Sequence, residues 1–265
     1  MGDRTDLERT LAFERRIVER VSTRLVPFPW GTAYLNDGYR ERWDSNFLWV
    51  DARGGADASD LMAEADRLLG GAGVTHREIR VDDDTYGASL TPALVAAGYG
   101  AERLVVMALR RGPDRRAAAE AKEIDVATLR SAIETVLRRE AWATSEEIVQ
   151  RLADFREELE QRAGARFFCA RADGEIVSMC ELYVDEGVAQ IEDVNTLEEF
   201  RGRGLGRAVV QAAIDAAAEV GAELVFIHAL EDDWPKDLYA KLGFDPIGHA
   251  WSFVRPSAPP MKSPA

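Results

Sequence analysis

Basic residues and long apolar runs are scarce in this 265-residue chain. Its 33 lysines and arginines face 47 aspartates and glutamates, which gives a net charge of -14. This excludes duplex nucleic acid as a partner, because phosphate binding requires clustered cations. No stretch approaches the ~18 apolar residues of a membrane span, and the charges throughout residues 1–16 exclude a secretory signal. We therefore expect a cytoplasmic protein that binds neither nucleic acid nor a membrane.

Cysteine and histidine are also too sparse to organise a site. Cys169 and Cys180 are the only cysteines, and His76, His228 and His249 each stand alone. None of them has the spacing of metal ligands or of a disulfide framework. We therefore predict no metal site, interpret both cysteines as buried packing residues, and interpret His228 as a core residue that could alternatively face a cleft.

Acidic residues, in contrast, are abundant in loops of the second half. Asp185, Glu186, Glu231, Asp232 and Asp233 stand beside expected strand ends. They could draw a cationic substrate such as a polyamine, an aminosugar or a protein N-terminus. The acidity could equally serve solubility alone.

The length of the chain and a repeated pattern indicate two α/β domains. The order helix, strand, helix, Gly-aromatic and strand occurs twice, with Gly73 and Gly98 in the first half and Gly221 and Gly243 in the second. We predict domains at residues 1–112 and 123–256, a linker at 113–122 and a disordered tail at 257–265. Each domain is expected to hold a mixed, mostly antiparallel sheet flanked by helices.

Most elements of the second half can be placed from their patterns. Residues 122–129 read as a strand or its approach, residues 129–140 and 145–162 as helices, and residues 187–196 as another strand. Apolar runs flank Asp173-Gly174, the pair best suited to a type I′ turn. Residues 166–186 are therefore predicted to form a β-hairpin.

A glycine-rich loop, RGRGLG at residues 201–206, joins the last of these strands to an expected helix. A strand, a glycine turn and a helix start form a phosphate-binding device, because backbone N–H groups and the helix dipole point at an anion. Gly206 is followed by Arg-Ala, where a nucleotide P-loop needs Lys-Ser/Thr, and Arg207 stands where the Rossmann fingerprint needs its third glycine. An RGG nucleic-acid element would be repeated within disordered sequence. The first half has no matching glycine spacing.

The pattern Arg201-x-x-Gly204-x-Gly206 resembles the acyl-CoA pyrophosphate motif of the GNAT acetyltransferase superfamily. LYAKLGF at residues 238–244 resembles a helix end of the same superfamily. The resemblance covers roughly residues 123–255 in element order and implies two tandem GNAT-like units. The N-terminal unit would be a degenerate copy without the CoA loop, and the C-terminal unit would use acetyl-CoA as acyl donor.

The resemblance also implies cofactor-binding residues. The superfamily lays pantetheine between two splayed strands, and the pyrophosphate meets amides of the loop. The implied cofactor-binding residues are Val194, Asn195, Thr196, Arg201, Gly202, Arg203, Gly204, Leu205, Gly206 and Arg207. The side chains of Arg201 and Arg203 could add charge or could be solvated.

Two catalytic residues are expected. Tyr239 matches the superfamily tyrosine that protonates or holds the leaving thiolate, although it could be a core residue. Gln190 stands where a glutamate base is frequent, and strand alternation places Gln190, Glu192, Val194 and Thr196 on one face. Glu192 is therefore the candidate base, its pKa raised near a dry cleft, or else a carboxylate that orients the substrate.

Two further positions near the expected site are less regular. Asp193 faces away from Glu192 unless a bulge shifts the register. Asp232 replaces the usual superfamily asparagine, which puts that side-chain contact in doubt.

The resulting hypothesis is an N-acetyltransferase that acts on a primary amine of a small molecule or peptide, and that could be a homodimer. One alternative is an aminosugar-thiol transferase such as mycothiol synthase. The other is an acyl-CoA sensor without catalysis, which could lose the Tyr239 hydroxyl without consequence.

Overall fold

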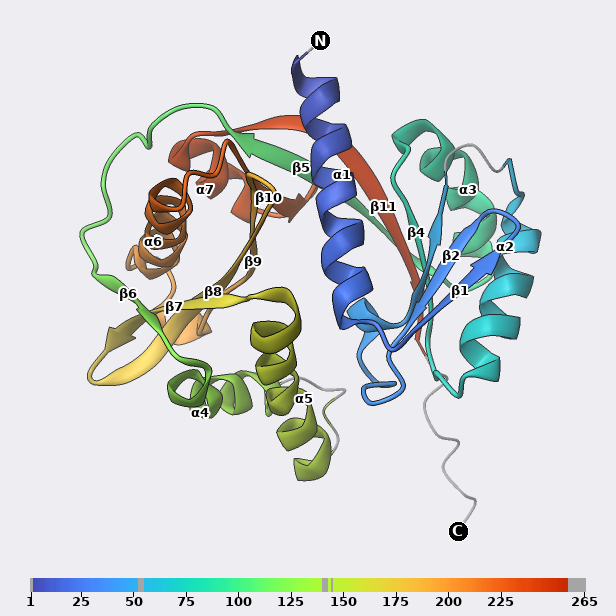
Figure 1. Cartoon of the computed structure of the whole chain (residues 1–265), viewed down its shortest axis with the longest axis horizontal. Coiled ribbons are helices and arrows are strands. Elements are labelled where there is room, and N and C mark those ends of the chain that lie inside the picture. Colours follow the sequence, from blue (N-terminus) through green and yellow to red (C-terminus); the bar gives the residue numbers. More distant parts are fainter. Residues whose placement is uncertain (1, 52–54, 140–142, 144, 257–265) are drawn as a thin grey trace. The chain divides into compact units, whose positions relative to one another are not determined.

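The computed structural model describes residues 2–51, 55–139, 143 and 145–256, so the predicted tail lies outside the described residues. None of the helices within these ranges is both long and apolar enough to cross a membrane. The helices and strands, labelled in Figure 1 where there is room, are in chain order α1 (Gly2–Val21), β1 (Arg24–Phe28), β2 (Gly31–Leu35), η1 (Trp43–Ser45), β3 (Phe47–Val50), α2 (Ala58–Ala65), η2 (Asp66–Gly70), β4 (Arg77–Val81), α3 (Asp84–Ala96), β5 (Gly100–Leu109), β6 (Ala121–Ile124), α4 (Val126–Leu137), α5 (Glu146–Glu158), η3 (Leu159–Ala163), β7 (Arg166–Ala172), β8 (Glu175–Asp185), β9 (Val188–Thr196), η4 (Glu198–Phe200), α6 (Leu205–Glu219), β10 (Leu224–Leu230), α7 (Pro235–Leu242) and β11 (Phe244–Arg255).

The chain divides into two compact units. Unit 1 contains Met1–Val21 and Val105–Gly248, and unit 2 contains Ser22–Leu104 and His249–Ala265. The predicted boundary near residue 112 lies close to one of these divisions. The predicted domains differ from the compact units in two described segments: residues 2–21 belong to unit 1, and residues 249–256 belong to unit 2.

Unit 1 holds the strand order β5-β10-β9-β8-β7-β6. The neighbours β9 and β10 are parallel and are joined by α6, whereas the pairs β8–β9, β7–β8 and β6–β7 are antiparallel. Helix α6 packs against β7, β8 and β9. Its buried residues, including Val209 and Val210, form one hydrophobic cluster with Ile191, Tyr239 and Cys180. Both cysteines are free and buried, which confirms their prediction as packing residues.

Unit 2 has a comparable arrangement. Its strand order is β1-β2-β3-β4-β11, in which β3 and β4 are parallel and the other pairs with known sense are antiparallel. Helix α2 joins the parallel pair, as α6 does in unit 1. The core of unit 2 contains Leu48, Leu61, Ile79 and Phe253. The mixed, mostly antiparallel α/β fold is therefore confirmed.

Strands β5 and β11 are the last strands of the two repeats. Part of each belongs to the unit that the order of the sequence does not suggest. Strand β5 follows α3, yet its Val105–Leu109 part belongs to unit 1, where β5 is next to β10. Strand β11 follows α7, yet Trp251–Arg255 pairs with β4 in unit 2. The repeated order of helix, strand, helix and strand is confirmed in both halves of the sequence. The order of elements alone does not reveal this exchange of strands.

Local sequence explains two turns of unit 1. Asp173 and Gly174 have φ of 53° and 89°, the positive values that a type I′ turn requires, so the predicted hairpin of β7 and β8 is confirmed. Residues 126–129, expected to belong to a strand, are instead helical. The side chain of Asp125 accepts a hydrogen bond from the Thr128 N–H at 2.7 Å and caps α4 one residue after β6 ends.

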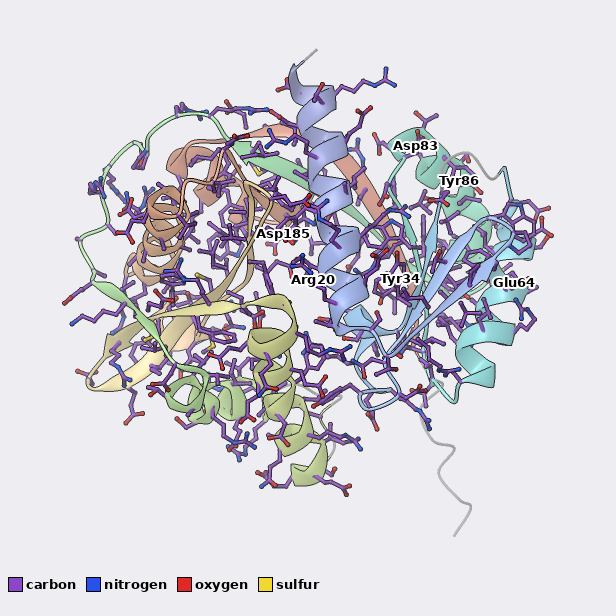
Figure 2. All side chains as sticks on the ribbon, viewed as in Figure 1. Arg20, Tyr34, Glu64, Asp83, Tyr86 and Asp185 are labelled. Atoms are coloured by element: carbon purple, nitrogen blue, oxygen red, sulfur yellow. The ribbon has the colours of Figure 1, made fainter. Side chains whose placement is uncertain are left out.

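Helix α1 is fastened within unit 1 by both apolar and ionic contacts. Phe13 is fully buried, with its ring centroid 5.6 Å from that of Phe226 on β10. The guanidinium groups of Arg16 and Arg20 each donate a 2.6 Å hydrogen bond to Asp185 at the end of β8. Figure 2 labels Arg20 and Asp185 in this pair. These contacts fix the face of α1 that lies over β8, β9 and β10.

Candidate active site

The glycine loop ends at the start of α6 and leaves the first helical turn without a side-chain cap. Gly202 and Gly204 have φ of 75° and 82°, left-handed values that glycine adopts without steric cost. Gly204 is the N-cap of α6, and no side chain accepts a hydrogen bond from the first turn. The exposed N–H groups and the dipole of this 15-residue helix therefore favour an anion at its start.

Helix α2 is the corresponding helix in unit 2, and its start is capped. The Asp57 carboxylate accepts a 2.9 Å hydrogen bond from the Asp60 N–H, and the Asp60 side chain reaches back to the Asp57 N–H. Two carboxylates thus meet the N–H groups that an anion would need, and like charge would repel a phosphate. The start of α6 can receive an anionic ligand, whereas the start of α2 is already satisfied.

The arginine side chains of the loop mainly hold its shape. Arg201 donates from Nε to the Thr196 carbonyl at 3.2 Å, and Arg203 donates to the Glu199 carbonyl at 3.1 Å. The Arg207 side chain is buried and donates to the Asp114 carboxylate at 2.7 Å. The groups of the loop that remain for a ligand are therefore mainly backbone N–H groups. Arg207 contributes its backbone N–H and not its side chain.

A cavity of 350 Å³ lies beside the first turn of α6. A Cβ added at Gly202 or Gly204 would meet nothing within 4 Å, so the space over the loop is open. Val194, Asn195 and Arg203 are predicted cofactor residues that do not line the cavity. The predicted residues that line it are Thr196, Arg201, Gly202, Gly204, Leu205, Gly206 and Arg207.

The same cavity has lining residues that sequence reasoning missed. Trp234, Asp237, Leu238 and Lys241 lie at the start of α7 and along it, at the spacing of one helix face. Trp234 is 58% exposed, which is unusual for a large aromatic side chain. This spacing beside the LYAKLGF motif was the available signal for a ligand-facing side of α7.

Strands β9 and β10 separate next to this loop. Their paired positions end at Ile191 and Ile227, although β9 continues to Thr196 and β10 to Leu230. Just past the last pair, Asp193 has a φ of 49°, and the register between β8 and β9 shifts. This β-bulge bends β9 and leaves its last residues available for another extended group.

A buried arginine holds the bulge in place. Arg156 of α5 donates from Nε to Glu181 at 2.8 Å and forms an ion pair with Asp193. The side chains of Arg156 and Glu181 are only 7% and 6% exposed. The expectation that Thr196 shares a face with Gln190 is wrong, because the bulge changes the alternation and Thr196 Oγ1 lies beside Gly206 at the start of α6.

Tyr239 is buried where α7 meets the sheet. It is 5% exposed, belongs to the hydrophobic cluster of unit 1 and lies edge-on to Phe244, with ring centroids 6.3 Å apart. Burial raises the pKa of Tyr239 above its ordinary value, so the hydroxyl stays protonated near neutral pH. It can therefore donate a hydrogen bond but resists giving up its proton.

Glu192 belongs to a polar cluster on the other face of β9. The Gln190 side-chain amide donates to Glu192 Oε1 at 2.7 Å and to Glu14 Oε1 at 3.4 Å. His228 Nδ1 lies 3.5 Å from the same Glu14 oxygen. Glu192 is exposed, so the expected dry cleft around it is not observed. His228 faces this cluster, which is the alternative that the sequence left open.

Sequence reasoning missed Glu14, because it assigned residues 1–112 to the other domain. Ligand atoms of Glu14, Glu192 and His228 lie within 4.8 Å of one another, a spacing that a metal ion could bridge. The isolated histidines gave no signal for this group, because its three members come from α1, β9 and β10.

Loop carboxylates expected to attract a cation are engaged within the protein. Asp185 accepts hydrogen bonds from Arg16 and Arg20, and Glu231 Oε1 lies 3.4 Å from Lys236 Nζ. These contacts do not favour Asp185 or Glu231 as the group that binds the acceptor.

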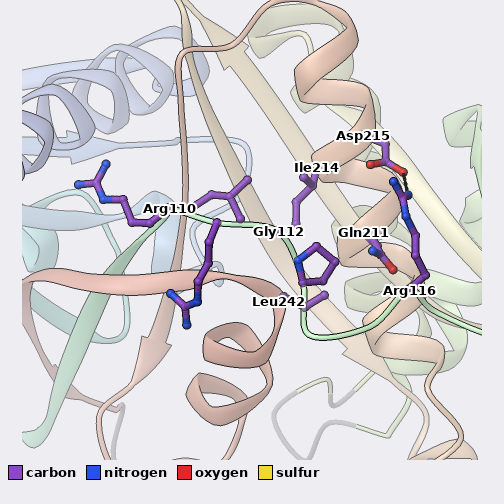
Figure 3. A pocket seen from close by; sticks show the side chains of 10 residues that line it. Arg110, Gly112, Arg116, Gln211, Ile214, Asp215 and Leu242 are labelled. Atoms are coloured by element: carbon purple, nitrogen blue, oxygen red, sulfur yellow. Dashed lines mark hydrogen bonds and ion pairs between the residues drawn. The ribbon is translucent and has the colours of Figure 1, made fainter.

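A second cavity of 430 Å³ lies between the linker and α6 (Figure 3). Gln211 accepts a 2.7 Å hydrogen bond from the Ala117 N–H, and Arg116 pairs with Asp215 at 3.1 Å. Arg111 pairs with Asp245. The basic groups in this cavity are therefore engaged in contacts within unit 1, which contains the predicted linker.

The comparisons with known proteins agree with this geometry, first in fold and then in family. The GCN5-related N-acetyltransferase from Kribbella flavida is similar over 95% of this chain and 96% of its own, with TM-score 0.62 and 21% identity. A tandem GNAT protein from the clavulanic acid biosynthesis pathway is similar over 87% of this chain and 80% of its own, with TM-score 0.54 and 18% identity. Residues 131–244 match the Acetyltransferase (GNAT) family, which supports the GNAT interpretation of the second half of the sequence.

A relative of known sequence class also matches part of the chain. An N-alpha-acetyltransferase of Sulfurisphaera tokodaii is 32% identical over 97 residues, which are 31% of this chain. The match spans 58% of that relative's length. The resemblance to the superfamily stated from residues 201–206 and 238–244 is therefore confirmed.

Proposed function

We propose that unit 1 transfers an acetyl group from acetyl-CoA to a primary amine of a small molecule or peptide. The observation that carries this proposal is the uncapped start of α6, which opens into a cavity next to the point where β9 and β10 separate. An anion-binding helix start and an unpaired strand end suit the two ends of one long ligand, a pyrophosphate and an amide-containing arm.

The residues present fit acetyl-CoA. The N–H groups of residues 203–207 would receive the pyrophosphate, and glycine at positions 202 and 204 leaves open space for its oxygens. Val194, Asn195 and Thr196 would bond the pantetheine arm through their backbone, because β9 no longer pairs with β10 there. Acetyl-CoA supplies the activated thioester, and the protein supplies position and proton transfer.

Glu192 is the proposed general base. The amine must lose a proton as its nitrogen bonds to the thioester carbon and the carbon–sulfur bond breaks. Glu192 accepts that proton, directly or through one water, and its exposed position leaves room for both arrangements. The carboxylate orientation is set by the 2.7 Å hydrogen bond from Gln190.

Tyr239 is proposed to hold the leaving sulfur. Thiols ordinarily have a pKa near 8.5, which lies below that of Tyr239, because burial raises the latter. Proton transfer from Tyr239 to the thiolate is therefore unfavourable, whereas a hydrogen bond from its hydroxyl stabilises the developing charge. This favours the holding role over the protonating role.

Unit 2 is proposed to be a degenerate GNAT-like unit that binds no CoA. Its α2 start carries the Asp57 and Asp60 cap in place of an open glycine loop. A pyrophosphate there would have to displace both carboxylates and would meet their charge.

The experiment is a screen of alkyl diamines, aminosugars and peptides with acetyl-CoA, in which the release of free thiol is followed. We expect thiol release that depends on one amine class and a product that is heavier by one acetyl group. CoA binding without thiol release for any amine would contradict the transferase and favour the sensor.

A further inference from the structure

The polar cluster of Gln190, Glu192 and His228 in unit 1 includes one residue from α1, Glu14. This residue is far in the sequence from the motifs at residues 201–206 and 238–244. Glu14 directly follows the buried Phe13 and has a side chain that is 14% exposed. His228, its neighbour on β10, is 18% exposed. Both side chains are thus partly enclosed, whereas Glu192 beside them is open to solvent. The cluster is therefore partly enclosed at Glu14 and His228 and open to solvent at Glu192.

The position of this cluster is set by the separation of the strands. Glu192 and His228 directly follow Ile191 and Ile227, the last paired residues of β9 and β10. A thioester that reached this point along the separated strands would end next to both side chains. Glu14 therefore lies where the acceptor of the proposed reaction has to enter.

The position of Glu14 is built by several contacts of α1. Arg16 and Arg20, two and six residues after it on α1, hold Asp185 with 2.6 Å hydrogen bonds. Arg9 pairs with Glu223 at 3.0 Å near the start of β10. These contacts on both sides of Glu14 fix the helix, so its carboxylate is pre-positioned.

The hydrogen bonds of the cluster indicate what it recognises. One N–H donor group, the Gln190 amide, lies between the Glu14 and Glu192 carboxylates at 3.4 and 2.7 Å. A primary ammonium is also a compact N–H donor, and its charge makes its hydrogen bonds to carboxylates stronger than those of an amide. The two carboxylates therefore suit an ammonium group better than a hydroxyl or an uncharged amine.

We infer that Glu14 and Glu192 together bind the acceptor as a protonated primary amine. Glu14 is the specificity-determining residue, and Glu192 then accepts the proton. This inference rests on the proposed function, because the bound ammonium is the group to be acetylated. It assigns the first helix of the chain to the acceptor site of unit 1.

The test is a binding titration without turnover. The full-length protein, saturated with CoA in EDTA-treated buffer, is titrated with n-butylammonium, or with 1-butanol as the neutral match. The imidazole proton resonance of His228, assigned with His228→Gln, reports binding beside Glu14. We expect a saturable shift with n-butylammonium and none with 1-butanol. Glu14→Gln should raise the dissociation constant at least tenfold, about 1.4 kcal/mol.

The matched control is Glu19→Gln, which removes the same charge from an exposed position on α1 and should leave the titration unchanged. Equal n-butylammonium affinity in Glu14→Gln and wild type, or equal shifts with 1-butanol, would overturn the inference. Micromolar Zn²⁺ binding with no response to n-butylammonium would also overturn it, in favour of a metal site. CoA affinity is measured separately, and an absence of CoA binding would contradict the proposed cofactor site without testing the role of Glu14.

Discussion

The Gln190 side-chain amide donates a 2.7 Å hydrogen bond to the Glu192 carboxylate, two residues along β9. Gln190 stands where the superfamily often has its glutamate base, and it cannot accept a proton. In this chain the residue orients the Glu192 carboxylate, which lies two residues further along the strand. Their contact therefore joins an uncharged residue at the usual base position with the carboxylate that we propose as the base.

The base role of Glu192 predicts a characteristic pH dependence. Glu192→Gln keeps the shape of the side chain but cannot remove a proton from the amine. The rate loss should be largest where the amine is mostly protonated and should shrink as rising pH supplies neutral amine. The measurement is kcat/KM against pH, with exposed Glu175→Gln as control. A defect of equal size at every pH would instead show an electrostatic or orienting role.

The Tyr239 hydroxyl should matter for chemistry and not for binding. Tyr239→Phe keeps the ring in the hydrophobic cluster, so we expect kcat to fall about 10²-fold while CoA affinity stays within about twofold. Tyr86→Phe is the matched control, because Tyr86 donates to the Ala56 carbonyl in unit 2. Wild-type kcat in Tyr239→Phe would remove Tyr239 from the mechanism.

His76 should make the stability of unit 2 depend on pH. Burial lowers the pKa of His76 to about 4, against the opposing effect of its 2.9 Å hydrogen bond with the Asn46 carbonyl. The unfolded chain, with an ordinary histidine pKa near 6.5, binds the proton first as pH falls. The unfolding free energy should therefore be unaffected by this group above pH 6.5. It should fall by up to about 3 kcal/mol as the pH approaches 4.

Urea unfolding of the full chain between pH 7.5 and 4.5 measures this effect. His76→Gln should lose the histidine part of the decline, and His249→Gln, at a half-buried position in the same unit, should keep it. An identical pH dependence in His76→Gln and wild type would contradict the assignment.

The sequence predicted the site best where the chemistry is local. The hairpin turn at Asp173-Gly174 depends on two adjacent residues, so the local pattern placed it. The glycine loop and Tyr239 also lie within short segments, and the resemblance of residues 201–206 and 238–244 to superfamily motifs placed them. The positive φ of Gly202 and Gly204 follows from the same local logic, because few other residues tolerate it.

What the sequence did not reveal depends on contacts between distant segments. Strict alternation along β9 fails because Arg156, 37 positions earlier, holds the bulge at Asp193. Glu14 reaches Gln190 over a separation of 176 residues. The exchange of β5 and β11 is equally hidden, because the last strand of each repeat has the same apolar pattern in either unit. Such contacts leave no periodic signal in the chain.

The claim on which the others depend is that unit 1 binds acetyl-CoA at the start of α6, and calorimetric titration with CoA tests it most directly. We predict one site per chain. Gly204→Asp should weaken binding at least tenfold, about 1.4 kcal/mol, because a carboxylate meets the pyrophosphate. Gly204→Asn, equal in size and tolerant of a positive φ, should weaken it less. Undiminished binding in folded Gly204→Asp, or two sites per chain, would contradict the account.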